Sequence, residues 1–235
     1  MSYEEHGGRT DVRAVLSDAI GRCAPKGHAE TWVLSFVVDV LLFDLGGVLL
    51  EFSGVRDVAP LLAVETSESE IRERWSRCPH SAAFSIGKLT RQDFAKRFVR
   101  DWGIALDPAR FLQEFRSWSR CLLPGAADLL ASLRSRVRLA ALSNSNEVHW
   151  ERNVNDLGVA ELFEVAISSH QVGCCKPDPR IYRAALDRLG VSPDAVMFFD
   201  DANANVIAAA ELGMRAFQVD GVEGVRERLI REGLL

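Results

Sequence analysis

The stretch FVVDVLLFDLGGV, residues 36–48, decides the fold of this chain. Residues 36–43 are apolar and rich in β-branched side chains, and the run ends abruptly at Asp44. A short run of this kind is typical of a strand that is buried on both faces, as in a parallel sheet. Gly46 and Gly47 follow, and glycines permit a sharp turn that lets a ligand approach the backbone closely. We therefore expect a strand that carries a carboxylate at its carboxyl end.

Four further apolar runs repeat this pattern, and helical patterns separate them. Asp178 and Pro179 predict the start of one helix, because aspartate caps helix N-termini and proline fits the first helical position, and Gly190 predicts its end. Strands that alternate with helices indicate an α/β fold with a doubly wound, Rossmann-like parallel sheet. The remaining predicted strands span residues 137–142, 164–167, 196–199 and 214–219, and the predicted helices span 126–134, 147–157, 178–189, 203–212 and 222–229.

One interval interrupts the alternation. Residues 55–122 contain helical patterns but no run with the apolar pattern of a buried strand. They lie between the first strand and its expected crossover helix. An insertion at this point lies over the carboxyl ends of the strands, where ligands bind in sheets of this kind. We therefore predict a core of residues 36–54 and 123–235 with an inserted helical cap of residues 55–122. We predict that residues 1–35 form an N-terminal arm, which is either disordered or helical over residues 12–20.

The composition excludes several classes of function. Hydrophobic residues make up 48% and charged residues 26% of the 235, which is ordinary for a globular protein. The formal net charge of -5 argues against a general nucleic-acid binder, which needs a basic stripe or face. Small acidic metabolites stay compatible, because a few local cations or a metal can hold them. The most apolar stretch, residues 32–50, is interrupted by Asp39 and Asp44 and falls short of a membrane span.

Cysteine usage favours a reducing compartment. The cysteines are odd in number and irregular in spacing, and no CxxC pair occurs, which argues against a zinc site or a disulfide framework. We therefore expect free thiols and a cytoplasmic location. The five residues are Cys23, Cys78, Cys121, Cys174 and Cys175.

Polar residues follow three of the predicted strands at the point where each strand ends. They are Asp44, Ser143 and the pair Asp200 and Asp201. Because the carboxyl ends of parallel strands share one edge of a sheet, we expect these side chains to lie together. Paired carboxylates repel one another unless a cation sits between them, and Mg²⁺ prefers such hard oxygen ligands. Lys176, on a loop after the third strand, would offset phosphate charge at the same edge.

Each of these residues also has a purely structural interpretation. Asp44 is compatible with capping a turn as well as with attack on phosphorus. Ser143 and Asn144 are compatible with an ordinary helix cap as well as with phosphate binding at a helix N-terminus. A loop lysine such as Lys176 is usually solvated, and the Asp200 pair is compatible with helix capping. The residues alone leave these alternatives open.

Four segments carry a resemblance to a known family. Each is weak singly, but together, in this order and at predicted strand ends, they form a specific pattern. The segments are FDLGGV (43–48), LSN (142–144), Lys176-Pro177 and FFDDANAN (198–205). Over about residues 38–220 they resemble the haloacid dehalogenase-like hydrolase superfamily, and most closely its bacterial α-D-glucose-1-phosphate phosphatase-like members. The resemblance implies a magnesium-dependent phosphatase with an inserted helical cap.

The resemblance also implies a role for each matching residue. Asp44 would be the nucleophile that forms an aspartyl phosphate, and Lys176 would neutralise charge. The phosphoryl oxygens would be bound by Ser143, Asn144 and Lys176. The ligands of Mg²⁺ would be Asp44, the Gly46 carbonyl, Asp200 and Asp201, the last of which would hold a metal-bound water or orient the loop.

Gly46 departs from the pattern of many phosphatases of this superfamily, which have a second aspartate there as general acid and base. Such assistance is typically worth about 10²–10⁴-fold, so the departure implies a substitute, a good leaving group or a slower reaction. Two alternatives therefore stay open, a haloacid dehalogenase-type hydrolase and a non-catalytic binding member of the same fold. The expected partner is a small phosphorylated metabolite, with a sugar phosphate as the leading expectation, and the chain would be a monomer or homodimer. Trp75, His80 and Phe84 are cap-side candidates for substrate contact, with core packing as the alternative for each.

Overall fold

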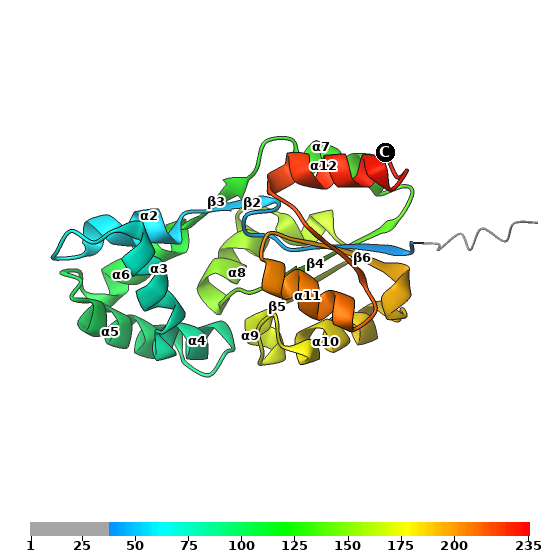
Figure 1. Ribbon diagram of the computed structural model, residues 1–235. Helices are drawn as coiled ribbons and strands as arrows, with labels where there is room; N and C mark the ends of the chain where they lie inside the picture. Colours follow the sequence, from blue (N-terminus) through cyan, green and yellow to red (C-terminus); the bar gives the residue numbers. More distant parts are fainter. Residues whose placement is uncertain (1–37) are drawn as a thin grey trace, which may run out of the picture. The chain divides into compact units, whose positions relative to one another are not determined.

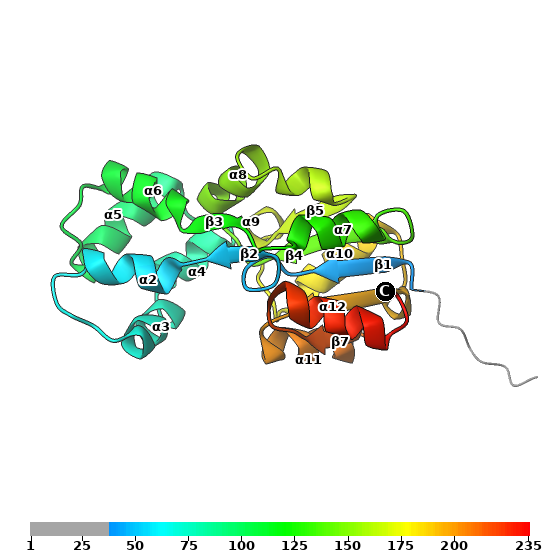
Figure 2. The same cartoon turned by 90° about the horizontal axis from the view of Figure 1, so that it is seen from above.

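The computed structural model describes residues 38–235, which form a parallel sheet with helices on both faces and a group of inserted helices beside it (Figures 1 and 2). The predicted doubly wound α/β fold is therefore confirmed. The predicted N-terminal arm, with its helix over residues 12–20, lies outside the described residues.

The strand order places the first strand in the centre of the sheet. The strands are β1 (Val40–Phe43), β4 (Arg138–Ser143), β5 (Val165–Ser168), β6 (Val196–Asp200) and β7 (Arg215–Gln218), and the order across the sheet is β5-β4-β1-β6-β7. All neighbouring pairs are parallel. Phe43 at the end of β1 lies opposite Ala141 of β4 and Phe199 of β6. This register brings the residues that follow these three positions to one level at the carboxyl edge of the sheet.

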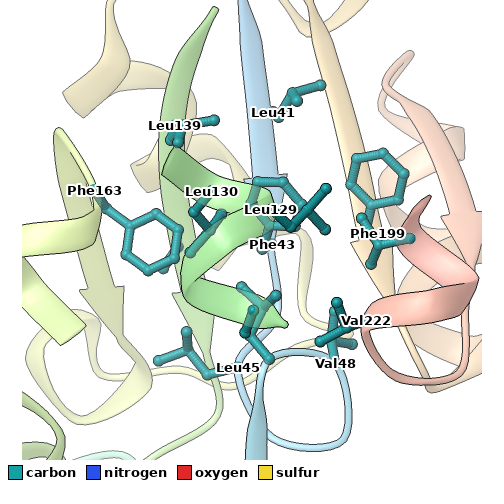
Figure 3. Close-up of a cluster of buried hydrophobic side chains, with 14 of the residues drawn as sticks. Leu41, Phe43, Leu45, Val48, Leu129, Leu130, Leu139, Phe163, Phe199 and Val222 are labelled. Atoms are coloured by element: carbon teal, nitrogen blue, oxygen red, sulfur yellow. The ribbon is translucent and has the colours of Figure 1, made fainter. Parts of the chain in front are cut away.

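Alternation along β1 divides its side chains between two hydrophobic clusters. Leu41 and Phe43 pack on one face of the sheet, together with Leu129 and Phe199 (Figure 3), whereas Val40 and Leu42 pack on the other. A strand buried on both faces needs apolar residues at every position, which explains the unbroken apolar run in the sequence. The first face is covered by α7 (Ala126–Leu133), α8 (Glu147–Asn155) and α12 (Gly221–Arg231), and the second by α9 (Ser169–Val172), α10 (Pro179–Leu189) and α11 (Asn203–Glu211).

The ends of α10 follow from local sequence signals. The Asp178 side chain accepts a hydrogen bond from the backbone N–H of Arg180, and Pro179 occupies the first turn. Gly190 ends the helix in a left-handed conformation with φ 67°, which glycine adopts without steric cost. Both predicted boundaries of this helix are confirmed. Lys176 lies on the loop that precedes this helix.

The inserted helices have a hydrophobic core of their own. This core is mainly aromatic, and the rings of Phe84 and Phe94 stack with centroids 4.3 Å apart. The helices are α2 (Gly54–Val58), α3 (Glu68–Ser76), α4 (Pro79–Ser85), α5 (Arg91–Trp102) and α6 (Pro108–Ser117). We refer to this group as the cap.

Two short strands connect the cap to the sheet. β2 (Leu50–Phe52) leads into the cap and β3 (Ser119–Leu122) leads out of it, and the two pair antiparallel. We expected no strand within residues 55–122, and β3 corrects that expectation. Its sequence, SRCL, has two exposed central residues and lacks the apolar pattern of a buried strand, so only its pairing with β2 defines it.

None of the helices within residues 38–235 combines the length and apolar character that crossing a bilayer requires.

The two-faced burial of β1 predicts which substitutions destabilise the fold. Replacing Leu42 with alanine should lower the free energy of unfolding by about 2–5 kcal/mol, because it opens a cavity in a close-packed region at the centre of the sheet. The exposed Ile230 on α12 is the matched control, and Ile230→Ala should change it by less than about 0.5 kcal/mol. Urea denaturation monitored by circular dichroism measures both. Equal effects of the two substitutions would contradict the assigned packing.

Candidate active site

The ammonium group of Lys176 lies between two carboxylates at the carboxyl edge of the sheet. Its Nζ is 2.8 Å from Oδ1 of Asp44 and 2.7 Å from Oδ2 of Asp200, and it also donates to the carbonyl of Leu142 at 2.8 Å. The Lys176 and Asp200 side chains are 0% exposed. Lysine has three N–H donors, and each has an acceptor here, so the ammonium group is fixed in orientation.

The sheet register and one loop together produce this contact. Asp44 follows β1 and Asp200 ends β6, its direct neighbour, so the two carboxylates come from adjacent strand ends. Lys176 arrives on the loop between α9 and α10, and the side chain of Asn144 fixes that loop. The Lys176 N–H donates to Oδ1 of Asn144 at 2.7 Å, and Nδ2 of Asn144 donates to the Lys176 carbonyl at 2.9 Å. Asn144 therefore positions Lys176 through its side chain.

Asp200 is held by hydrogen bonds on both of its oxygens. Oδ1 accepts from the Ala202 N–H and from Nδ2 of Asn205, each at 2.9 Å, while Oδ2 accepts from Lys176. Asn205 thus orients this carboxylate, and the helix that follows begins after Ala202. Capping of α11 by the aspartate pair, the alternative interpretation of these residues, is not what the structure shows at the helix start.

Asp201 lies next to the glycine turn after β1. A Cβ atom added to Gly47 would stand 2.6 Å from Oδ2 of Asp201, closer than real contacts allow, and Gly47 has a φ of +78°. Glycine is therefore favoured here on conformational grounds, and a larger residue would also push the Asp201 side chain aside. At Gly46 the same atom would meet only the Cβ of Phe52, at 3.8 Å, which is an ordinary contact.

The acidic side chains fit a divalent cation. Asp44, Asp200 and Asp201 each offer a carboxylate oxygen, and these oxygens lie within 4.8 Å of one another. Mg²⁺ takes hard oxygen ligands and keeps part of its water shell, so a few carboxylates beside a cavity suit it. The structure brings together all of the carboxylates that we predicted as ligands, and Gly46 also lines the cavity above them.

Burial shifts the pKa values of two of these groups. Removal from water raises the pKa of Asp44 to about 6, the charge of Lys176 opposes this shift, and the charge of Asp200 adds to it. Burial, followed by the charge of Asp200, also raises the pKa of Asp201. Neighbouring positive charge is therefore what favours the ionised, nucleophilic form of Asp44.

A cavity of about 430 Å³ opens over these carboxylates between the sheet edge and the cap. Of the sequence-predicted residues, the cavity is lined by Asp44, Gly46, Ser143, Asn144, Lys176 and Asp201. Of the cap-side candidates, only Trp75 lines it. Phe84 is buried in the cap core, and Nε2 of His80 pairs with Oδ2 of Asp101 at 2.8 Å, so both serve the cap itself.

Comparison with known proteins identifies the family. A family model described as haloacid dehalogenase-like hydrolase matches residues 38–213, most of the chain. The chain belongs to this family.

Individual relatives agree with that assignment. Phosphatase MT3486 of Mycobacterium tuberculosis is 28% identical over 83% of this chain and 93% of its own length. The phosphorylated carbohydrates phosphatase of Thermotoga maritima is 33% identical over 75% of this chain and 82% of its own. The fold is similar to that of a haloacid dehalogenase family enzyme from Bacteroides thetaiotaomicron solved with magnesium and inorganic phosphate, with a TM-score of 0.67 and 23% identity over 78% of this chain and 94% of that one. The protein is thus a phosphatase-like hydrolase of the haloacid dehalogenase-like family.

The inner wall of the cavity in this hydrolase is polar and was not predicted as part of the site. It is formed by Ser119, Asn146, His149 and Asn153, all buried. Three of them lie on α8 or at its N-cap, three to four residues apart, which places them on one helix face. That spacing is a signal in the sequence, but a histidine such as His149 is more often a surface or satisfied side chain, and we predicted no place for it in the site. The cap side adds Phe52 and Arg72, which the sequence patterns also did not indicate.

His149 links the cap to the core as a neutral ring. Its Nε2–H donates to the Phe115 carbonyl at 2.7 Å, and its Nδ1 accepts from Nδ2 of Asn146 at 3.0 Å. Burial lowers the pKa of His149 to about 4, because charging the ring away from water is unfavourable. Both ring nitrogens are used, so His149 positions the wall and does not replace the missing acid at Gly46.

Ionic contacts also join the cap to α8. Nε of Arg91 at the start of α5 is 3.0 Å from Oε1 of Glu147, and its Nη2 is 2.5 Å from Oε1 of Glu151. Between α9 and α4, the Ser169 hydroxyl donates a hydrogen bond to the Ser85 carbonyl at 2.7 Å. These contacts hold the cap against α8 and α9.

The two glycines after Asp44 should respond differently to the same substitution. Gly47→Ala should lower the free energy of unfolding by at least about 1–2 kcal/mol, the usual cost of a left-handed non-glycine residue, and should weaken Mg²⁺ binding because the new methyl displaces Asp201. Gly46→Ala should affect the fold much less. Urea denaturation and isothermal calorimetry with Mg²⁺ test the pair, and equal sensitivity of both positions would contradict the geometry.

The neutral His149 predicts a pH dependence of stability. An unfolded histidine has a pKa of about 6.5, so between that pH and about 4 only the unfolded chain binds the proton and stability falls as the pH falls. A difference of about 2.5 pKa units corresponds to about 3 kcal/mol at the acid end. His149→Gln removes this contribution, so its stability relative to wild type should rise from pH 7 to pH 4 in urea denaturation. Parallel pH profiles for the two proteins would refute the assignment.

Proposed function

We propose that this hydrolase is a magnesium-dependent phosphomonoesterase that releases phosphate from a small phosphorylated metabolite, with a sugar phosphate as the favoured class. The observation that carries the proposal is the buried ion pair of Asp44 and Lys176 beside a second pair of carboxylates, at the floor of the cavity. The names of relatives support it, since they include a phosphorylated carbohydrates phosphatase and a glyceraldehyde 3-phosphate phosphatase.

The chemistry would begin at Asp44. Lys176 holds Oδ1, which leaves the other oxygen to attack phosphorus while the bond from phosphorus to the leaving-group oxygen breaks. The result is an aspartyl phosphate and an alcohol that takes up a proton. Water then attacks the same phosphorus, the bond to Asp44 breaks, and inorganic phosphate leaves with the carboxylate restored.

The surrounding residues would bind the phosphoryl group. The Ser143 hydroxyl lines the cavity and has no hydrogen-bond partner within residues 38–235, so it is available to a phosphoryl oxygen. The Asn144 side chain is already bonded to Lys176, so its contribution would come from the backbone N–H. Mg²⁺, held by Asp44, Gly46, Asp200 and Asp201, would neutralise charge on the phosphoryl oxygens.

Gly46 bears on the choice of leaving group. Among the described residues that line the cavity, Asp44 and Asp201 are the only carboxylic acids. We assign Asp44 as the nucleophile and both residues as ligands of the metal. A leaving group that departs without strong acid assistance suits this cavity best. The anomeric hydroxyl of a sugar 1-phosphate is more acidic than an ordinary alcohol, which favours this class of substrate.

The cellular setting belongs to the same proposal. Cys78, Cys121, Cys174 and Cys175 are free thiols, in agreement with the reducing cytoplasm that we predict. The active unit would be a monomer or a homodimer, because a single chain supplies every residue of the proposed site.

Phosphate release over a panel of metabolites, with p-nitrophenyl phosphate as a generic probe, tests the proposal. Activity should require Mg²⁺, disappear in EDTA and return when Mg²⁺ is restored. Asp44→Asn should lower kcat at least about 1,000-fold, because it removes the nucleophile. Asp39→Asn is the matched control, since Asp39 is exposed at the opposite end of the same strand region, and it should leave kcat within about twofold.

The alternatives predict different outcomes of the same assay. Halide release from a 2-haloalkanoate that persists in EDTA, without phosphate release, would identify a dehalogenase. A wild-type protein that is silent over the whole panel would identify a non-catalytic binding member of the fold. Either result would overturn the phosphatase assignment.

A further inference from the structure

The polar inner wall of the cavity contains one hydrogen-bond donor that the described part of the protein leaves unused. Asn146 uses both of its polar atoms, since its Oδ1 accepts from the N–H groups of Val148 and His149, each at 3.1 Å, and one N–H of its Nδ2 donates to the His149 ring. His149 uses both of its ring nitrogens, one toward Asn146 and one toward the cap. Of the four side chains in this wall, Asn153 is the one whose Nδ2 has neither of its hydrogens bonded within residues 38–235.

Asn153 is satisfied on one side only. Its Oδ1 accepts a hydrogen bond from the Ser119 hydroxyl. Its Nδ2 has no acceptor within residues 38–235, although the residue is only 4% exposed and lines the cavity. Nδ2 is not wholly shut off from solvent, so a ligand in the cavity can reach it and accept its hydrogen bonds. The amide group thus presents two N–H bonds to whatever occupies the cavity.

The wall contributed from the cap side has the opposite character. Phe52, with 47% of its surface exposed, and Trp75 both line the cavity, and they offer aromatic surface. A ligand held between these walls needs an apolar face toward the rings and an oxygen acceptor toward Asn153. Sugars combine these features, because their C–H faces contact aromatic rings while their hydroxyls accept hydrogen bonds at the edge.

We propose that Asn153 determines specificity, by donating a hydrogen bond from Nδ2 to a hydroxyl oxygen of a sugar leaving group. This inference rests on the proposed phosphatase function and deepens it. It assigns discrimination between leaving groups to a residue on the core helix α8, separate from Asp44 and Lys176, which act on the phosphoryl group.

Two substitutions of Asn153 separate its donor from its role in the fold. Asn153→Leu has a similar volume and removes both polar groups. Asn153→Asp keeps an oxygen for the Ser119 hydroxyl and replaces only the donor. The matched controls are Asn155→Leu and Asn155→Asp, at an exposed position near the end of the same helix. Thermal unfolding reports whether each variant is folded.

The measured quantity is the ratio of kcat/KM for α-D-glucose 1-phosphate to kcat/KM for p-nitrophenyl phosphate, which has no hydroxyl in its leaving group. Both Asn153 variants should lower this ratio by about 10- to 100-fold, the loss expected for one hydrogen bond to the substrate. A general loss of folding or of phosphate affinity lowers both constants and leaves the ratio unchanged. Both Asn155 variants should keep the ratio within about twofold.

Several results would overturn the inference. An unchanged ratio in both Asn153 variants would remove Asn153 from substrate recognition. A ratio lowered by leucine but kept by aspartate would mean that the side chain accepts and does not donate. A wild type that releases phosphate from p-nitrophenyl phosphate but not from the sugar phosphate would refute the sugar class while leaving the phosphatase intact. A wild type that releases phosphate from neither probe would instead overturn the proposed function and this inference with it.

Discussion

The buried ammonium group of Lys176 is the interaction on which the site depends. Two carboxylates stand at adjacent strand ends with almost no access to water, and without a neighbouring positive charge their ionisation would be strongly unfavourable. Lys176 supplies that charge from the loop between α9 and α10. This loop must therefore pass close to the carboxyl ends of β1 and β6. The Asn144 side chain fixes the loop through two hydrogen bonds to the backbone of Lys176. The strand register, the loop and the acidic side chains therefore form one arrangement.

The floor of the site could be predicted from the sequence, because the apolar runs that mark its strands are local patterns. Apolar runs mark strands that are buried on both faces, and parallel strands end at a common edge, so the convergence of Asp44 and Asp200 follows from the order of the elements. The polar wall does not follow in this way. His149 bonds to Phe115 of the cap and Asn153 to Ser119 of β3, and in each case the partner is 34 residues away in the chain. No local pattern shows which distant carbonyl or hydroxyl a buried side chain will find.

The cap explains why only one of three aromatic or histidine candidates reaches the cavity. Its own core needs large side chains, and Phe84 is used there, while His80 is bonded to Asp101 on the cap surface. Trp75 lies between that core and the cavity, with edge contacts to Phe98 and Trp102 on one side. From sequence, a tryptophan that packs and a tryptophan that also faces a ligand look the same. The difference arises from where α3 lies relative to the sheet edge, which is a tertiary property.

The antiparallel pair of β2 and β3 has a consequence for how proteins of this architecture diversify. The chain leaves the sheet and returns to it through two strands that lie side by side, so everything between them forms an excursion with a single narrow base. Helices can be lengthened, exchanged or lost beyond that base without moving the strand ends that hold Asp44 and Asp200. Evolution can in this way exchange the side chains that the cap presents to a compound while it keeps the core residues that break the bond.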